Sequence, residues 1–287
     1  MSRTVDVAAL RPVALTPEQI AGGLLLSAEA GWNQIADDWR FMLESGAGFG
    51  FADDGDRLVA SGLTVEFPDY AWISMILVTQ AWRRQGLATR LMERCVDALA
   101  ARRLVAALDA SPDGREVYRR IGFRDTATST RLGGDLSDAT PPAGIELAAL
   151  AAPDLAAVAA YDRLSSGTDR TILLGHLLQR LPAAAFVVRR QGRVSGFVMA
   201  RPGRMSAQIG PLVAEDDATA LALLAGAGRA IGAPVCLDLF DQRRALRDWL
   251  DGRGFRLLTR FFRMVRGPAT IAPADHRTYI IAGPELG

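Results

Sequence analysis

Two neighbouring arginines, a glutamine and a glycine (Arg83 to Gly86) stand between an apolar run and a helical pattern. The apolar residues Ile73 and Met75 to Val78 indicate a buried strand, and after the glycine a pattern begins in which apolar residues recur every four positions. Backbone N–H groups in the first turn of a helix lack partners within the helix, and the helix dipole adds partial positive charge there. A strand, a basic loop with a glycine and a helix start therefore predict a phosphate-binding site.

Composition and charge limit the class of protein. The chain has 287 residues, 49% apolar and 23% charged, which is enough for two ordinary domains with packed cores. A formal net charge of +1 argues against binding to nucleic acid or membrane surfaces through bulk charge, and no apolar stretch is long enough to span a bilayer. The start lacks the layout of a secretion signal, so we expect a soluble cytoplasmic protein. With two distant cysteines and two histidines, no compact metal site can be drawn.

The order of expected elements occurs twice along the chain. In each half a helical pair is followed by a strand, a turn and a strand, at Phe49–Gly62 and at Ala185–Gly196. Each half continues with another strand, a helix, and a last helix that runs into Gly-Phe and a closing strand. The stretch Gly133–Gly144 is rich in Gly, Pro, Ser and Asp and is the best linker. The sequence therefore predicts two copies of one α/β unit, over residues 1–135 and 144–287.

Two motifs carry a resemblance to a known family. Residues Arg83 to Ala88 satisfy the pattern (Gln/Arg)-x-x-Gly-x-(Gly/Ala), which resembles the acyl-CoA pyrophosphate loop of the GNAT superfamily of N-acetyltransferases. The segment Gly114–Phe123, with Tyr118 ahead of a Gly-Phe pair, resembles the segment that closes the cofactor site in the same superfamily. The separation of the two motifs and the strand between them agree with that family.

Two further segments resemble a bacterial group of two-domain GNAT proteins. These are the turn Glu29-Ala-Gly-Trp-Asn33 and the tail Thr278–Gly287, in which Tyr279 to Ala282 indicates a last strand. The resemblance implies an α/β (α+β) fold of two tandem GNAT-type units, each with a mixed, mostly antiparallel central sheet flanked by helices.

The resemblance also implies how acetyl-CoA would bind as a co-substrate. The backbone of Leu77 and Val78 would pair with the pantetheine arm like an added strand. Tyr118 would point at the thioester sulfur and protonate the departing thiolate, since a phenol with a pKa of ~10 can donate to a forming thiolate of ~8.5. Backbone amides would hold the pyrophosphate with arginine charge beside them, and the residues concerned are Arg83, Arg84, Gln85, Gly86, Leu87, Ala88 and Thr89.

The general base and the acceptor site are less defined by the sequence. The amine arrives mostly as ammonium and must lose a proton before it attacks. Glu66 is the first candidate for a base and Asp69 the second, although either is equally suited to be a solvated hairpin carboxylate, and a relayed water would also serve. Trp32 would wall the acceptor pocket and Asn33 would bond its polar group, while Asn33 is at least as well suited to cap the following helix.

The second unit lacks both cofactor features. After Val213 come the acidic residues Glu215 to Asp217, with no arginine or glycine, and three carboxylates would repel a diphosphate. Where the first half has Tyr118, the second has Leu250 at the same spacing from Gly-Phe. We therefore expect a degenerate copy that does not bind CoA and that shapes the acceptor pocket or stabilises the pair.

The expected function is direct transfer of an acetyl group from acetyl-CoA to the amine of a small molecule or an amino-acid-like metabolite. The protein would act as a monomer or homodimer, without a metal and without nucleic-acid or membrane partners. Two alternatives stay open, namely a non-catalytic acyl-CoA-binding sensor and a protein or peptide N-acetyltransferase. An intact Tyr118 favours the enzyme, because a sensor needs no acid beside the sulfur.

Overall fold

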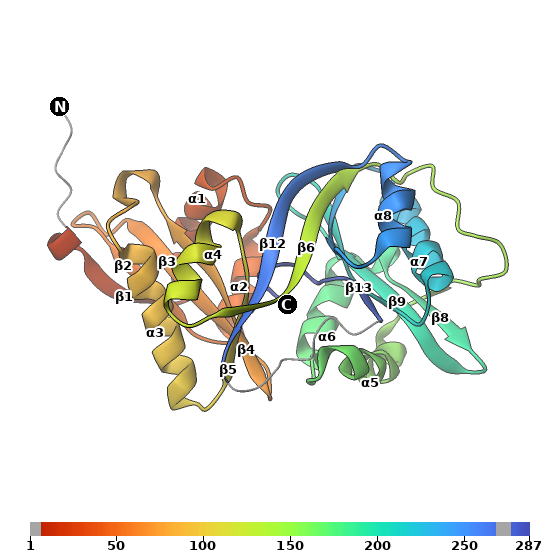
Figure 1. Ribbon diagram of the computed structural model, residues 1–287, viewed down its shortest axis with the longest axis horizontal. Coiled ribbons are helices and arrows are strands. Elements are labelled where there is room, and N and C mark those ends of the chain that lie inside the picture. Colours follow the sequence, from red (N-terminus) through yellow and green to blue (C-terminus); the bar gives the residue numbers. More distant parts are fainter. Residues whose placement is uncertain (1–6, 268–276) are drawn as a thin grey trace.

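A computed structural model of the chain describes residues 7–267 and 277–287, and it shows the same order of helices and strands twice (Figure 1). The fold prediction is confirmed. The sequence also predicts a first strand near Val5 to Val13; the strand lies at Arg11–Leu15, and Val5 is outside the described residues. The first half contains β1 (Arg11–Leu15), α1 (Ile20–Glu29), α2 (Ala36–Glu44), β2 (Gly48–Ala52), β3 (Leu58–Glu66), β4 (Tyr70–Val78), α3 (Leu87–Ala101), β5 (Val105–Ala110), α4 (Pro112–Arg120) and β6 (Arg124–Gly134).

The second half repeats this order and adds a strand from the tail. Its elements are β7 (Ala148–Ala149), α5 (Leu155–Ser166), α6 (Thr171–Arg180), β8 (Phe186–Arg190), β9 (Arg193–Arg201), β10 (Ala207–Ala214), α7 (Asp217–Ile231), β11 (Val235–Phe240), α8 (Arg244–Asp251), β12 (Arg256–Arg266) and β13 (Thr278–Ile280). The short strand β13 overlaps the run Tyr279 to Ala282 that the sequence indicated as a last strand.

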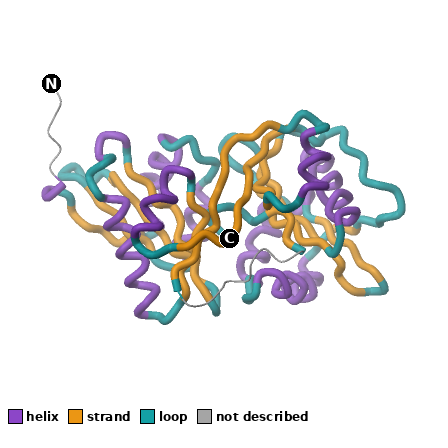
Figure 2. The backbone as a smooth tube through the Cα atoms, viewed as in Figure 1, coloured by secondary structure: helices purple, strands orange, loops and turns teal. Residues whose placement is uncertain are grey.

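The two halves exchange their last long strands. The sheet has the order β1-β2-β3-β4-β5-β12-β6-β11-β13-β10-β9-β8-β7, so β12 of the second half lies beside β5 of the first, and β6 of the first lies beside β11 of the second. Both exchanged pairings are antiparallel, and β6 and β12 also pair with each other. Figures 1 and 2 show these two strands side by side across the middle of the molecule. The halves therefore share one continuous sheet.

A buried ion pair fixes each exchanged strand. Arg263 of β12 donates two hydrogen bonds, both of 3.0 Å, to Asp109 of β5. Arg131 of β6 donates two of 2.8 Å to Asp238 of β11. Each arginine stands directly opposite its aspartate in the strand register. Removing one member of such a buried pair leaves an uncompensated charge, so these contacts specify which strand lies beside which.

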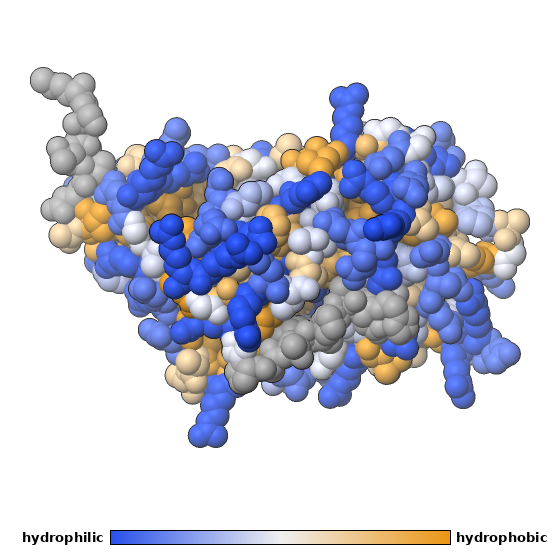
Figure 3. Space-filling model, in the orientation of Figure 1, coloured by the Kyte–Doolittle hydropathy of each residue, from blue (hydrophilic) through white to orange (hydrophobic). Residues whose placement is uncertain are grey.

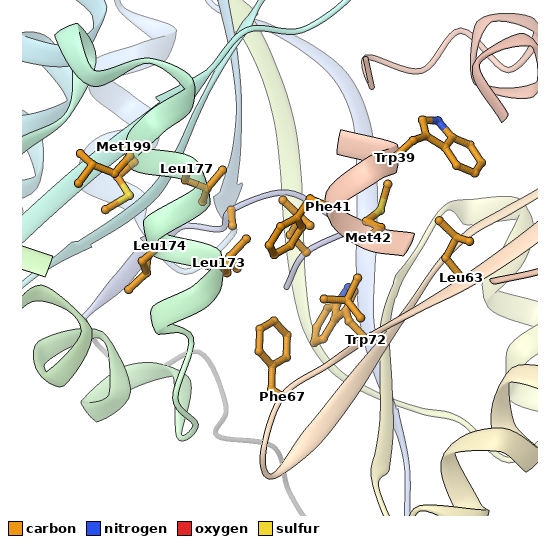
Figure 4. Packing of buried hydrophobic residues seen from close by; sticks show 14 of the residues in the cluster. Trp39, Phe41, Met42, Leu63, Phe67, Trp72, Leu173, Leu174, Leu177 and Met199 are labelled. Carbon is orange, nitrogen blue, oxygen red and sulfur yellow. The ribbon is translucent and has the colours of Figure 1, made fainter. Parts of the chain in front are cut away.

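The apolar core continues across the junction between the halves. Figure 4 shows Phe41 of α2 pointing toward Leu173 of α6, and both side chains are buried in one cluster with Met42 and Leu177. α2 and α6 are corresponding helices of the two halves, and the rings of Phe41 and His176 stack between them with centroids 4.4 Å apart. Separating the halves would expose part of this apolar cluster to water, which is unfavourable.

Charged and polar side chains cover most of the face seen in Figure 3, with smaller apolar areas between them. Among the residues described, no helix is both long enough and apolar enough to cross a membrane. The same residues contain no group of three or more His, Cys, Asp or Glu side chains placed to hold a metal ion.

Candidate active site

The predicted phosphate loop ends at an open helix N-terminus. Gly86 is the N-cap of α3 with φ of 80°, and no side chain caps the helix there. A side chain at position 86 would need this left-handed conformation, and the space that its Cβ would occupy is empty to 4 Å. Since Leu87, Ala88 and Thr89 form the first turn, their N–H groups have no acceptor within the helix. These free backbone N–H groups and the open space beside Gly86 are therefore suited to bind a diphosphate.

The rest of the loop supplies charge beside the helix N-terminus. Arg83 and Arg84 are exposed, while Gln85 is half-buried. Arg84 has φ of 61°, which turns the chain into the helix. Arg83 donates from Nε to the Val78 carbonyl at 3.0 Å, so a ligand that used this carbonyl would have to displace the arginine.

A split between β4 and β5 leads away from the loop into the molecule. These parallel strands pair only from Tyr70 to Trp72 on β4, and Met75 in β4 has φ of 52°. Beyond the paired part, the edge of β4 that faces β5 is unpaired through Leu77 and Val78. An extended ligand arm can add to such an edge as a strand does, which fits the predicted position of the pantetheine arm.

Tyr118 of α4 lines the cavity at this split and is half-buried. Its ring lies over Gly114, where an added Cβ would come within 2.9 Å of the ring, and it packs against Phe123. Burial, with a smaller effect of Cys95, raises the pKa of the Tyr118 phenol. The phenol is therefore protonated at neutral pH and can donate a proton or a hydrogen bond. The Cys95 thiol is itself buried, which raises its pKa to about 12 and makes it a poor nucleophile.

Both halves line the cavity. It has a volume of about 430 Å³ and is bounded by β4, β5 and α4 of the first half and by the 205–206 loop, Cys236, β12 and the tail of the second. This volume is in the range of small-molecule sites. The loop after α1 forms one wall through Trp32, Asn33 and Gln34.

Asn33 connects the two halves. Its Oδ1 accepts from the backbone N–H of Met205 at 2.8 Å, and its Nδ2 donates to the Ser206 carbonyl at 3.0 Å. The N-cap of α2 is Ile35, so the capping alternative for Asn33 is wrong. Because its amide is already used in these contacts, Asn33 positions the 205–206 loop at the cavity wall.

Neither predicted carboxylate base reaches the cavity. Glu66 ends β3 and pairs with Arg102 at 2.5 Å, just beyond the C-terminal end of α3. The phosphate loop is at the other end of this helix of 15 residues, which is roughly 20 Å long. Asp69 instead accepts from Thr168 of the second half at 2.7 Å. A base must lie within hydrogen-bond reach of the amine or one water away, so the structure does not support Glu66 or Asp69 in this role.

The equivalent site in the second half is filled by the chain itself. Asp216 caps α7 by accepting from the Thr219 N–H at 2.8 Å, so a carboxylate occupies the helix N-terminus that is open in α3. Burial opposes ionisation of Asp216, but hydrogen bonds from Arg190 and Thr219 outweigh it and lower the pKa to about 2. Leu250 is fully buried, and its carbonyl accepts from Phe255 at 3.1 Å, as the Tyr118 carbonyl accepts from Phe123.

The split between β10 and β11 is also closed. These strands pair in parallel only as far as Ile209 and Leu237, and β13 then pairs with both of them. Tyr279 of β13 donates to Asp217 at the start of α7 at 2.6 Å. The tail strand β13 therefore fills the split between β10 and β11, whereas the corresponding split between β4 and β5 is open.

Sequence reasoning missed the charged and polar residues that the second half and the tail bring to the cavity. Arg131, Asp109 and Glu285 line it together with Gln34. The sequence did single out the tail, but only as a strand. No local pattern links residue 285 to a site that begins at residue 83, because their proximity depends on the strand exchange and on the path of β13.

The comparisons with known proteins agree with this fold. Residues 14–134 and residues 158–280 match two family models, each described as an acetyltransferase (GNAT) domain. The two matches together span most of the chain, and the chain belongs to the GNAT family of acetyltransferases, with two GNAT domains in tandem. No curated protein sequence matches it.

Solved structures share the arrangement of both halves. A Pyrococcus horikoshii protein assigned as an acetyltransferase has a TM-score of 0.80 at 19% identity, over 99% of this chain and 98% of its own. A GCN5-related N-acetyltransferase from Sphaerobacter thermophilus has a TM-score of 0.67 at 13% identity, over 94% and 99%. A tandem GNAT protein from the clavulanic acid biosynthesis pathway has 0.62 at 17%, over 91% and 100%. At these identities the likeness shows the fold alone.

Proposed function

We propose that this protein transfers an acetyl group from acetyl-CoA to the amine of a small molecule by direct transfer. One observation carries the proposal: the open N-terminus of α3, the unpaired edge of β4 and Tyr118 follow one another into a cavity of about 430 Å³. Each of these features has a counterpart in the second half that is capped, filled or replaced. We infer one cofactor site for each chain, in the first half.

The residues present would perform simple steps. When bound, acetyl-CoA supplies a thioester whose carbonyl carbon is attacked by a neutral amine. The first-turn amides of α3 and the nearby arginines would hold the diphosphate, and the free edge of β4 would orient the arm. As the C–N bond forms and the C–S bond breaks, Tyr118 would give a proton or a hydrogen bond to the sulfur. The amine proton would leave through water, because Glu66 and Asp69 do not line the cavity and the two carboxylates that do, Asp109 and Glu285, are already paired with Arg263 and Arg201.

The shape of the cavity favours a small acceptor over a peptide. The α1–α2 loop, the 205–206 loop, β12 and the tail enclose the cavity, and Pro284 and Glu285 lie in its wall. An extended peptide would need an open groove, whereas a cavity of this volume suits a metabolite.

The test is to mix full-length protein with acetyl-CoA and a library of small amines while following release of free thiol, with calorimetry of acetyl-CoA binding in parallel. Thiol release that depends on an amine supports the enzyme. Binding of acetyl-CoA without thiol release across a broad library would favour the sensor alternative. Absence of acetyl-CoA binding would contradict the whole assignment of the site.

A further inference from the structure

Two exposed apolar side chains line the cavity that Tyr118 also lines. Met205 is 69% exposed and Leu258 is 57% exposed. Trp32, which is half-buried, lines the same cavity from the α1–α2 loop. Single exposed apolar residues are common on protein surfaces, whereas a group of them that lines one cavity from separate segments indicates a binding surface. Trp32, Met205 and Leu258 are called the apolar wall below.

The loop that carries Met205 is fastened to the turn that carries Trp32. The Met205 N–H donates to Asn33 Oδ1 at 2.8 Å, and the Arg204 N–H donates to the Asn33 carbonyl, also at 2.8 Å. Arg204 Nε donates to the Trp32 carbonyl at 2.9 Å. The backbone on both sides of this part of the cavity is therefore held in place, and the exposure of Met205 does not come from a frayed segment.

A β-bulge directs Leu258 to the cavity. In the register of β12 with β6, Leu257 lies opposite Leu132 and Thr259 lies opposite Arg131, so Leu258 is an extra residue. Side chains of successive residues in a regular strand point to opposite faces, yet Leu258 and Thr259 both line the cavity. Gly133 of β6 leaves room for this arrangement, because a Cβ there would come within 2.9 Å of Leu258 Cδ1.

The charges in the cavity wall are neutralised within the protein. Among the described residues that line it, the charged ones are Asp109, Arg131 and Glu285, and their ion-pair partners are Arg263, Asp238 and Arg201. The ring of Phe261, another lining residue, also lies 5.2 Å from the guanidinium carbon of Arg131. These lining residues therefore offer no unpaired charge to a carboxylate or to a second ammonium group of a ligand.

An uncharged apolar wall selects a particular kind of amine. Burying an apolar body against it is favourable, whereas burying a charged group without a partner is costly. The same environment lowers the pKa of an alkylammonium, which favours the neutral amine that attacks the thioester. This agrees with a site in which no free carboxylate stands ready as a base.

We propose that the acceptor is an amine with an uncharged apolar body, alkyl or aromatic, which binds against the apolar wall, and that the site discriminates against amines that carry a second charge. This inference rests on the proposed acetyltransferase function. The second half lacks the cofactor features, but it contributes to acceptor selection because Met205 and Leu258 both belong to it.

The first experiment measures binding without turnover. Full-length protein is titrated calorimetrically with N-propylacetamide and N-hexylacetamide, the acetylated forms of two simple amines, and with 6-acetamidohexanoate and N-(6-aminohexyl)acetamide. We expect about threefold tighter binding for each added methylene, or roughly thirtyfold from propyl to hexyl. The two compounds with a charged end should bind at least about tenfold more weakly than N-hexylacetamide. Equal affinities for propyl and hexyl, or a charged end that binds as tightly as the hexyl chain, would overturn the inference.

Two variants test the apolar wall directly. Met205→Gln keeps the length of the side chain and Leu258→Thr keeps a residue suited to a strand, and both positions are exposed, so folding should be unaffected. Each variant should reduce the preference for hexyl over propyl about threefold or more. Ile172→Thr is the matched control, because Ile172 of α6 is 80% exposed and does not line the cavity. A preference that persists in both variants, or that the control also loses, would contradict the inference.

Thiol release distinguishes this inference from the proposed function. With acetyl-CoA present, kcat/KM should be higher for hexylamine than for propylamine, 6-aminohexanoate or 1,6-diaminohexane, and KM for acetyl-CoA should be the same in all three variants. Thiol release that is as efficient with the doubly charged compounds as with hexylamine would retain the enzyme and refute the apolar acceptor. Preferential binding of N-hexylacetamide without thiol release from any amine would retain the apolar site and refute the enzyme.

Discussion

Replacing Tyr118 by Phe tests the chemistry of the site with little structural disturbance. The ring packs over Gly114 and against Phe123, with ring centroids 6.3 Å apart, and phenylalanine keeps both contacts. Only the hydroxyl is lost. General acid catalysis contributes on the order of 10² to 10⁴ in rate. Because burial raises the pKa of Tyr118 well above that of a thiol, proton transfer is uphill, so we expect the lower end, about a hundredfold.

The assay is thiol release under single-turnover conditions, with acetyl-CoA binding measured separately by calorimetry. A hundredfold loss corresponds to about 2.7 kcal/mol of barrier. Affinity for acetyl-CoA should change less than threefold. Tyr279→Phe is the matched control, since it removes the hydroxyl that bonds Asp217 in the second half and should leave turnover within about twofold.

The pH profile gives an independent reading of the same group. An acid catalyst acts in its protonated form, so its rate contribution falls only above the pKa in the folded protein. Burial raises the pKa of Tyr118 above its usual value, so no alkaline decline due to this group is expected below about pH 10. A turnover rate that hardly changes in the Phe variant, or an alkaline decline near pH 8 that the variant abolishes, would refute the acid role.

Three further perturbations test the loop, the capped helix and the exchanged strands. Gly86→Val should weaken acetyl-CoA binding, measured by calorimetry, about a hundredfold or more, because charge-assisted hydrogen bonds to the diphosphate are lost. Gly144→Val, at another open site with φ of 85°, controls for backbone strain and should leave the affinity for acetyl-CoA unchanged. Asp216→Ala removes the α7 cap and should lower the free energy of unfolding in urea by about 1 kcal/mol. The stoichiometry of acetyl-CoA should remain one per chain, because β13 still fills the second split; a second site would contradict this. Arg263→Leu leaves Asp109 unpaired with 1% side-chain exposure and should destabilise the fold by about 3–5 kcal/mol at pH 7. Burial raises the pKa of the Asp109 carboxyl above its unfolded value, so its contribution to folding stability is greatest below the unfolded pKa and is lost as pH rises through the folded pKa. The loss of unfolding free energy in Arg263→Leu should therefore be smaller at pH 5 than at pH 7. Equal losses at both pH values would contradict this reasoning.

Much of the fold was predictable because its signals are local. The apolar run before Arg83, the helical period after Gly86 and the Gly-Phe ends of α4 and α8 each lie within a few residues of the elements they define. The predicted base failed for a reason that is not local. Glu66 is on the strand next to the cofactor strand, but the antiparallel register pairs it with Ala71, whereas Val78, which leads to the loop, pairs with Ala60. Glu66, at the end of β3, therefore lies beside the end of β4 that is remote from the phosphate loop.

The sequence by itself predicted a phosphate loop in the first half and its absence from the second, because the first turn of a helix, a glycine before it and the sign of nearby charges depend on neighbouring residues. Only the tertiary structure decided that β6 and β12 change places and that the tail closes the second split. It also decided that Glu285 and Gln34 line the same cavity. These features depend on pairings between residues far apart in the chain, and a pattern of hydrophobic and charged positions does not specify which distant strand becomes the neighbour.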